Sequence, residues 1–396
     1  MKQGNKVFGG ILIIAGTTIG AGMLALPILS ASMGFFYSII LIVIMWLLAL
    51  FSSLVTVEII LYYRRNVSVP YLAGKFIGRS AKFLGAVSLL VLLYSVLSAY
   101  ISGLSSVISK NFISNLGESY ISLIVTVLVG YIIFFSIRAV DYTNRILFVA
   151  KIILFILVVV TFIPYVKIDN FLITSSFDKL PEIILVFFTS FGFHGSIPTV
   201  VKYVGHDIKS LRKVFVFGSG IPLVTYILWQ IVTLGVLPFN GDHSFSNVLS
   251  HGNSVGVFIN DLSAITNKET LRMILDMFSI LAMLTSIIGV AIGLFDYIAE
   301  SLKYQFTKFE KIKTIIFTFG IPLIFSVYYP SGFILALNFA AIALVILAIV
   351  FPAVIALRTR KNYIIGQYKV LGGDIMLYLA VIIGMFLVML RLSQFL

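Results

Sequence analysis

The sequence predicts an all-α polytopic membrane protein with eleven transmembrane helices. Of its 396 residues, 60% are hydrophobic and only 11% are charged, and the mean hydropathy is +1.11. A water-soluble fold cannot bury so large an apolar fraction, whereas a bilayer can solvate it. The apolar runs and the positions of the basic residues then define the helices one by one.

Eleven apolar runs approach or exceed the roughly 20 residues that one membrane crossing requires. They cover residues 7–30, 34–62, 83–108, 120–138, 145–166, 181–201, 214–237, 272–299, 312–329, 332–357 and 372–395. The first run is longer than the apolar region of a cleavable signal peptide, so we expect it to stay in the protein. Residues 1–396 then form a single transmembrane domain, because the polar stretch near 238–267 is too short to bury its own core.

The basic residues predict the orientation of these helices. If the amino terminus is cytoplasmic, 22 of the 28 Lys and Arg residues fall in or beside the inner connectors. The carboxyl terminus then lies on the periplasmic or extracellular face. The net charge of +13 therefore indicates membrane topology rather than nucleic-acid binding. Cysteine and the zinc-binding HExxH pattern are both absent, so we expect no metal, no cofactor and no enzyme activity.

Two of the apolar runs are interrupted near their centres. Gly16 to Gly22 reads GTTIGAG and is followed by Pro27, and Thr189 to Ser196 reads TSFGFHGS and is followed by Pro198. Broken helices survive at membrane depth only where they line a cavity or are buried in protein. Matching breaks in two halves of a chain are typical of the central site of a transporter.

The positions of the two breaks predict a five-plus-five inverted repeat. Residues 7–166 form the first repeat and residues 181–357 the second, so that helices 1 and 6 are the broken ones. Residues 372–395 form one extra helix. A channel would not need paired breaks, and a receptor would need a soluble output domain.

Three strings resemble the hydroxy and aromatic amino acid permease family, and above all its tyrosine-specific permeases. They are GTTIGAGMLALP (Gly16 to Pro27), TSFGFHGSIP (Thr189 to Pro198) and GLFDY (Gly293 to Tyr297). The family belongs to the amino acid, polyamine and organocation superfamily. The resemblance implies import of an aromatic amino acid, first of all tyrosine, by proton symport across the bacterial inner membrane with alternating access. A sodium-coupled symporter and a permease preferring tryptophan or phenylalanine are the alternatives, and the oligomeric state is open.

The first break is expected to bind the charged ends of the substrate. A helix that stops near Thr17 and restarts near Met23 presents N–H groups and partial positive charge to a carboxylate. Free carbonyls at both breaks suit the ammonium group. The backbone positions expected to bind substrate are Thr17, Thr18, Gly20, Ala21, Gly22 and Gly195. Alternatively, Gly16 and Gly20 form a GxxxG face for close helix packing.

Three aromatic residues are candidates for contact with the substrate side chain. Phe191 and Phe193 flank the second break, and Tyr100 lies on the third helix, which lines the site in transporters of this superfamily. Because 14% of the residues are aromatic, the alternative for each is ordinary core packing.

His194 is the histidine predicted at membrane depth, within the second break. Burying an ionisable group in the membrane is costly, and imidazole titrates in the physiological range, so we expect it to handle substrate or protons. The alternative is a structural role in capping a free carbonyl.

Lys151 lies early in the fifth helix. The resemblance implies that a lysine here replaces the sodium ion of sodium-coupled relatives and carries the proton, facing Thr285 and Ser286 of the eighth helix. Alternatively, Lys151 extends to the cytoplasmic surface as an anchor.

Further acidic residues lie near the helix ends. Thr285, Gly289, Ile292 and Asp296 share one line of the eighth helix, where Asp296 either pairs with a basic residue or gates the inner mouth. Asp276 is expected to face the outer vestibule or to be structurally paired. Glu58 is expected to pair with Arg64 or Arg65.

Overall fold

Every regular element of the described chain is a helix, which confirms the all-α prediction. The computed structural model describes residues 3–20, 22–63, 67–113, 115–135, 137–172, 176–266, 268–302, 307–361 and 368–393. The first half contains α1 (Gln3–Thr18), α2 (Gly22–Ser30), α3 (Phe35–Tyr63), α4 (Val69–Phe76), α5 (Arg79–Asn111), α6 (Glu118–Phe135) and α7 (Ile137–Phe162). The second half contains α8 (Leu180–Ser190), α9 (Ile197–Val204), α10 (Ile208–Val236), α11 (Phe245–Ser250), α12 (Val255–Ala264), α13 (Glu269–Ser301), α14 (Lys308–Tyr328), α15 (Phe333–Val345), α16 (Phe351–Arg360) and α17 (Gly373–Leu392).

Short irregular helices join these elements. Three 3-10 turns are η1 (Ile163–Tyr165), η2 (Ile168–Phe171) and η3 (Phe193–Ser196), and one π-helical stretch, η4 (Ile346–Val350), joins α15 to α16. Among the described residues, nine helices are long and apolar enough to cross a membrane, and the bent pair α1 and α2 makes a tenth. The shorter apolar helix α6 covers most of the expected run 120–138. The count of eleven and the inverted repeat stay predictions.

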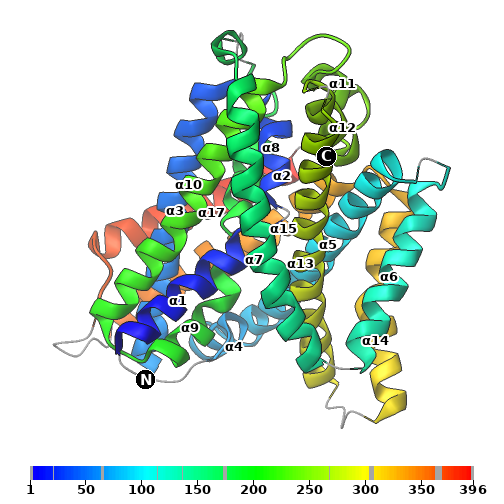
Figure 1. Cartoon of the computed structure of the whole chain (residues 1–396). Coiled ribbons are helices and arrows are strands. Elements are labelled where there is room, and N and C mark those ends of the chain that lie inside the picture. Colours follow the sequence, from blue (N-terminus) through cyan, green and yellow to red (C-terminus); the bar gives the residue numbers. More distant parts are fainter. Residues whose placement is uncertain are drawn as a thin grey trace.

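α5, α13 and α15 form the centre of the bundle. α5 packs against both α13 and α15, while α1 packs against α10, and α10 against α3. α6 and α14 pair at one edge of the molecule (Figure 1). α11 and α12 lie at one end of the bundle, and α4 lies near the amino terminus at the opposite end (Figure 1). We call these the outer and inner ends, after the orientation that the basic residues predict.

The polar stretch after α10 folds as α11 and α12 without a core separate from the bundle. Phe245 of α11 and Phe258 of α12 are buried, and their rings stack with centroids 5.9 Å apart. Phe258 also contacts the ring of Trp229 on α10, at 6.4 Å between centroids. These two short helices therefore complete the outer end of the same apolar core.

A buried ion-pair network joins three helices at the inner end. The Arg360 guanidinium donates to both carboxylate oxygens of Glu58, each at 2.7 Å, and to Asp374 at 2.8 Å. The Val370 N–H also donates to Glu58, at 2.7 Å. Glu58 thus pairs with Arg360, which lies 302 residues further along the chain. The expected partners, Arg64 and Arg65, lie outside the described residues.

α17 is held at both ends, although the sequence marks it only as an extra helix. Asp374 in its first turn bonds Arg360, and Arg391 near its other end is buried and interacts electrostatically with Glu182 of α8. Glu182 in turn accepts a 2.7 Å hydrogen bond from Asn338 of α15. The polar contacts of α17 therefore tie it to both sides of the bundle.

Local capping explains where α10 begins. The Asp207 side chain accepts a 3.0 Å hydrogen bond from the Ser210 N–H, which satisfies one of the free donors of the first turn. Hydrogen bonds from Ser210 hold the pKa of the exposed Asp207 carboxyl below its usual value. The cap therefore persists unless the pH falls through that lowered pKa.

We expect Arg360→Met to lower the free energy of unfolding by about 3–5 kcal/mol, because the Glu58 carboxylate would stay buried without its cation. Thermal melting of the purified protein in detergent measures this loss. Arg358→Met is the matched control, since the exposed Arg358 guanidinium bonds only the carbonyls of Phe76 and Ile77. Equal losses in the two variants would contradict a distinct contribution from the buried network.

Candidate substrate site

The first break separates α1 from α2. α1 ends at Thr18, α2 begins at Gly22, and the two helices are bent by 53°. The Thr18 hydroxyl donates to the Ile14 carbonyl of its own helix at 2.6 Å, and the Thr17 hydroxyl donates to Ile13 at 2.9 Å, so neither hydroxyl hydrogen is free for a ligand. The backbone N–H groups of Gly20 and Gly22 meet no acceptor among the described residues, while Ala21 lies outside them. Free donors at the start of α2 are what a carboxylate requires.

The second break separates α8 from α9. α8 ends at Ser190, the turn η3 follows, and α9 begins at Ile197. The Ser190 hydroxyl contacts the first break directly, donating to the carbonyl oxygen of Gly22 at 3.4 Å. Thr17 Oγ1 and Ser196 Oγ lie 3.3 Å apart. The two breaks therefore meet, as the paired interruptions in the sequence predict.

Tyr226 of α10 contacts the backbone of both breaks. Its hydroxyl lies 2.8 Å from the carbonyl oxygen of Thr18 and 2.7 Å from that of Ser190. The side chain is fully buried, so this single hydroxyl is shared between two carbonyls that water cannot reach. Sequence reasoning missed Tyr226, because nothing near it in the chain distinguishes it from the other 18 tyrosines.

Lys151 of α7 binds the first break from the opposite side. Its Nζ donates to the Ile19 carbonyl oxygen at 2.6 Å and to Thr285 Oγ1 at 3.3 Å. Nζ also lies 4.7 Å from the centre of the Phe148 ring, and the side chain is only 1% exposed. Lys151 therefore points into the protein toward α13 rather than extending to the surface as an anchor.

Glycine allows α13 to approach the first break. A Cβ atom at Gly20 would lie 2.7 Å from Ser286 Oγ, so only glycine permits this contact. A Cβ at Gly16 would meet the Phe148 ring at an ordinary 3.5 Å. Gly20 therefore serves close packing as well as the break, and the two interpretations of this glycine are compatible.

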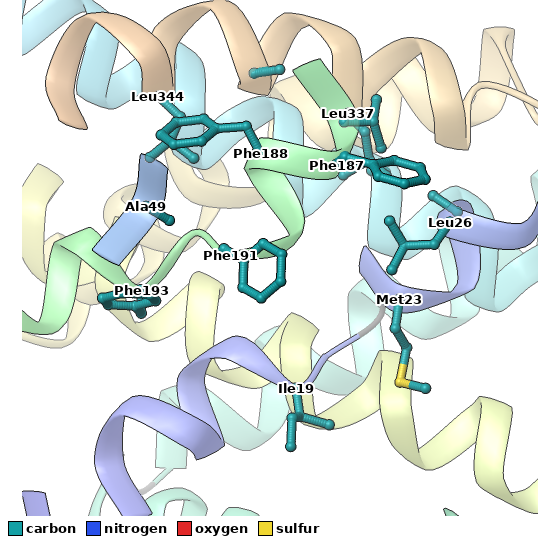
Figure 2. Packing of buried hydrophobic residues seen from close by; sticks show 14 of the residues in the cluster. Ile19, Met23, Leu26, Ala49, Phe187, Phe188, Phe191, Phe193, Leu337 and Leu344 are labelled. Carbon is teal, nitrogen blue, oxygen red and sulfur yellow. The ribbon is translucent and has the colours of Figure 1, made fainter. Parts of the chain in front are cut away.

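The three candidate aromatic residues differ in position. The Phe191 ring is buried between the breaks and lies 5.1 Å from the Tyr226 ring (Figure 2). Phe193 points away from that gap and stacks on Phe215 at 6.3 Å, so its surroundings are those of a packing residue (Figure 2). Tyr100 is half-buried on α5.

His194 faces α3. Its Nε2 lies 2.7 Å from Ser52 Oγ, and its ring stacks on Phe193 with centroids 5.0 Å apart. Nδ1 is buried and has no hydrogen-bond partner among the described residues. His194 therefore braces the second break against α3 and retains one unpaired ring nitrogen.

α2 and the second half of α13 differ in exposure. All nine residues of α2 are buried. On α13, by contrast, Gly289 and Asp296 are exposed, and no atom lies within 4 Å of a Cβ built at Gly289. Both share a line with Thr285, which contacts Lys151, so this line runs from the breaks to the inner end. Gly195 is likewise exposed with open space around it.

The structure gives the surroundings of two acidic residues of α13, Asp276 and Asp296. Asp296 is exposed on α13, and no ion pair to it occurs in the part of the chain that the structure describes, so its choice between pairing and gating stays a prediction. Asp276 is structurally paired, the second of its two expected roles, and does not face a vestibule: it is 3% exposed, accepts a 2.9 Å hydrogen bond from Asn111 and lies 3.8 Å from Arg272. Among the described residues, no group of three or more acidic or histidine side chains is arranged to hold a metal.

Replacing Tyr226 by Phe should lower the free energy of unfolding by about 1–3 kcal/mol for each carbonyl left unpaired, because no water replaces the hydroxyl. Thermal melting in detergent measures the change. Thr225→Val is the matched control, since the neighbouring Thr225 hydroxyl bonds only Ile221 within its own helix. If Tyr226→Phe melts like Thr225→Val, the hydroxyl does not hold the breaks together.

Comparison with known proteins agrees with this geometry. Residues 3–391 match the tryptophan/tyrosine permease family. The chain is 36% identical to the tyrosine-specific transport system 1 of Haemophilus influenzae, over 96% of this chain and 95% of that protein. It is 35% identical to system 2 of the same organism, over 96% and 94%, and 32% identical to its tryptophan-specific transport protein, over 97% and 94%. These relatives are named transport systems rather than enzymes, and the chain belongs to the tryptophan/tyrosine permease family of multi-pass membrane proteins.

Proposed function

We propose that the protein imports an aromatic amino acid, first of all tyrosine, by proton symport across the bacterial inner membrane with alternating access. The observation that carries the proposal is the meeting of two helix breaks, joined by Tyr226 and leaving free N–H groups at the start of α2. The amino terminus is then cytoplasmic and the carboxyl terminus external, and two inverted repeats surround the site.

The amino acid's charged ends have distinct partners in this proposal. The N–H groups of Gly20 and Gly22, with the positive end of α2 behind them, suit the carboxylate. The carbonyls of Thr18 and Ile19 are already bound by Tyr226 and Lys151, so they are poor acceptors for the ammonium group. The backbone of the second break, around the exposed Gly192, is the better place for it.

An aromatic side chain suits the apolar part of the site. Phe191 lies between the breaks, and Tyr100 provides an aromatic surface with a polar tip on the facing helix. The relatives named as tyrosine-specific share slightly more of the sequence than those named as tryptophan-specific, at 36% against 32%. Tyrosine is therefore the first substrate to test, with tryptophan and phenylalanine as competitors.

Lys151 is the basis for proton rather than sodium coupling. Its Nζ donates hydrogen bonds to the Ile19 carbonyl and the Thr285 hydroxyl. A sodium ion at this position would have to be coordinated by the same two oxygen atoms. When charged, the ammonium also repels a nearby cation, strongly so where water is excluded. A proton leaving and returning to Nζ would release and restore the hydrogen bonds that hold the first break to α13, which links proton binding to helix movement.

Proton coupling predicts that tyrosine uptake into proteoliposomes continues without sodium when the interior is alkaline, and stops when a protonophore is added. Lys151→Met, which keeps the length of the side chain but cannot bind a proton, should lose this accumulation. Exchange of labelled for unlabelled tyrosine reports whether that variant still binds substrate. Strict dependence on sodium would refute proton coupling and leave sodium symport as the mechanism.

His194→Ala should reduce tyrosine uptake by roughly tenfold or more, the effect of losing about 1.4 kcal/mol, within the range for a hydrogen bond at a buried site. Initial rates at several tyrosine concentrations measure it. Ser52→Ala separates the possible roles, because it removes the hydroxyl partner of Nε2 but keeps the imidazole. Normal kinetics of His194→Ala would reduce this residue to packing.

A further inference from the structure

Four exposed cations gather where α4 meets α5 at the inner end of the bundle. We call Lys75, Arg79, Lys82 and Arg358 the basic corner. Gly78, whose φ is +137°, turns the chain between the two helices, so the last turn of α4 and the first turn of α5 are adjacent. α16 packs against α4 and brings Arg358 to the same place.

Close contacts hold two of these side chains at the corner. The aliphatic part of Lys82 lies against Gly74 of α4, where an added Cβ would stand 3.0 Å from the lysine Cδ. One nitrogen of the Arg358 guanidinium donates to the carbonyl oxygens of Phe76 and Ile77, at 2.7 and 3.3 Å, at the end of α4. These contacts use the stem of one side chain and a single nitrogen of the other, so both charges remain at the surface.

No carboxylate of the described chain neutralises the basic corner. α4, α5 and α16 contain no acidic residue, and the one acid of α3, Glu58, is bonded by Arg360. Asp374 is a further partner of Arg360. Where the structure describes the chain, no ion pair includes any of the four cations. Their charges therefore repel one another, and an anion from outside the protein would relieve this repulsion.

Apolar side chains continue from the cations along the outside of α5. Phe83 is 73% exposed, and Leu84 and Val87 are also exposed. On a helix of a membrane protein, such side chains face lipid. Tyr71 of α4 is exposed as well, and tyrosine favours the boundary between headgroups and hydrocarbon. The basic corner therefore lies at headgroup depth, and the apolar face of α5 lies beside the acyl chains.

We propose that the basic corner binds the headgroup of an anionic phospholipid from the adjoining leaflet. Guanidinium and ammonium groups bind phosphate oxygens with charge-assisted hydrogen bonds. The acyl chains of the lipid lie along Phe83 and the rest of the apolar face. A free phosphate ion would make only the polar contacts, so the neighbouring apolar face favours the lipid.

The bound lipid joins three helices at the inner end, because the four cations belong to α4, α5 and α16. None of these cations is a residue of the proposed substrate site. The inference also does not depend on which amino acid is transported or on whether Lys151 carries the proton. It can therefore fail while the proposed function stands, and the reverse.

The absence of cysteine allows a single reporter in the full-length protein. Phe83→Cys, labelled with a small fluorophore, places this reporter on the acyl-chain side of the basic corner. The labelled protein is reconstituted in phosphatidylcholine vesicles that contain either brominated phosphatidylglycerol or the same fraction of brominated phosphatidylcholine. Bromine on an acyl chain quenches a fluorophore that it contacts. The ratio of the two quenching efficiencies therefore measures the preference for the anionic lipid at the corner.

We expect brominated phosphatidylglycerol to quench more strongly, and each cation removed to lower the relative affinity about fivefold, the contribution of one Lys or Arg near an anionic surface. Arg79→Gln combined with Lys82→Gln should therefore lose most of the preference. Lys308→Gln combined with Lys313→Gln is the matched control and should keep it. These two exposed lysines belong to the first turns of α14, which Figure 1 shows apart from α4.

Equal quenching by the two lipids in the parent, an unchanged preference in the corner variant, or an equal loss in the control would overturn the proposal. Sodium phosphate should displace the lipid no better than sodium chloride at the same ionic strength. Stronger displacement by phosphate would show that the occupant is the free anion, and would overturn the proposal as well. All four replaced cations are exposed, so both variants should fold, and size-exclusion profiles verify this.

Discussion

The hydrocarbon core of a bilayer offers no hydrogen bonds, so each backbone group released by a broken helix must find its partner inside the protein. In this permease three released carbonyls do so through two side chains. Tyr226 binds Thr18 and Ser190, and Lys151 binds Ile19. These partners come from α10 and α7, so the breaks exist only because the surrounding bundle is assembled. The remainder of the site depends on this arrangement.

Satisfying the carbonyls has a chemical consequence for the site. The protein supplies hydrogen-bond donors to the Thr18 and Ile19 carbonyls of the first break, whereas the N–H groups of Gly20 and Gly22 have no acceptor among the described residues. Together with the positive end of α2, these donors give the first break a positive local potential. An anion is the natural ligand there. The second break, which has exposed glycines at Gly192 and Gly195, is the more open side.

The polar contacts are distributed unevenly between the inner end and the surroundings of the site. The buried pair of Glu58 and Arg360, with the exposed Asp374 as a further partner of Arg360, joins α3, α16 and α17 at the inner end. Near the site, by contrast, Gly20 lies close to Ser286 of α13, and Gly289 and Asp296 further along α13 are exposed. A fixed frame around a pair of interrupted helices is the arrangement that alternating access requires.

Local sequence was sufficient for the helical class, the approximate helix limits, both breaks and the membership of the family. Hydropathy and the positions of Gly and Pro act within a few residues, so these features can be read along the chain. The orientation of Lys151 and the roles of Tyr226 and Arg360 emerged only from the tertiary structure. In sequence, Ile19 lies 132 residues from Lys151, Thr18 lies 208 residues from Tyr226, and Glu58 lies 302 residues from Arg360. A tyrosine that bonds a free carbonyl and a tyrosine that only packs in the core look the same in the local sequence. Only the tertiary structure shows which of them lies beside an unpaired carbonyl.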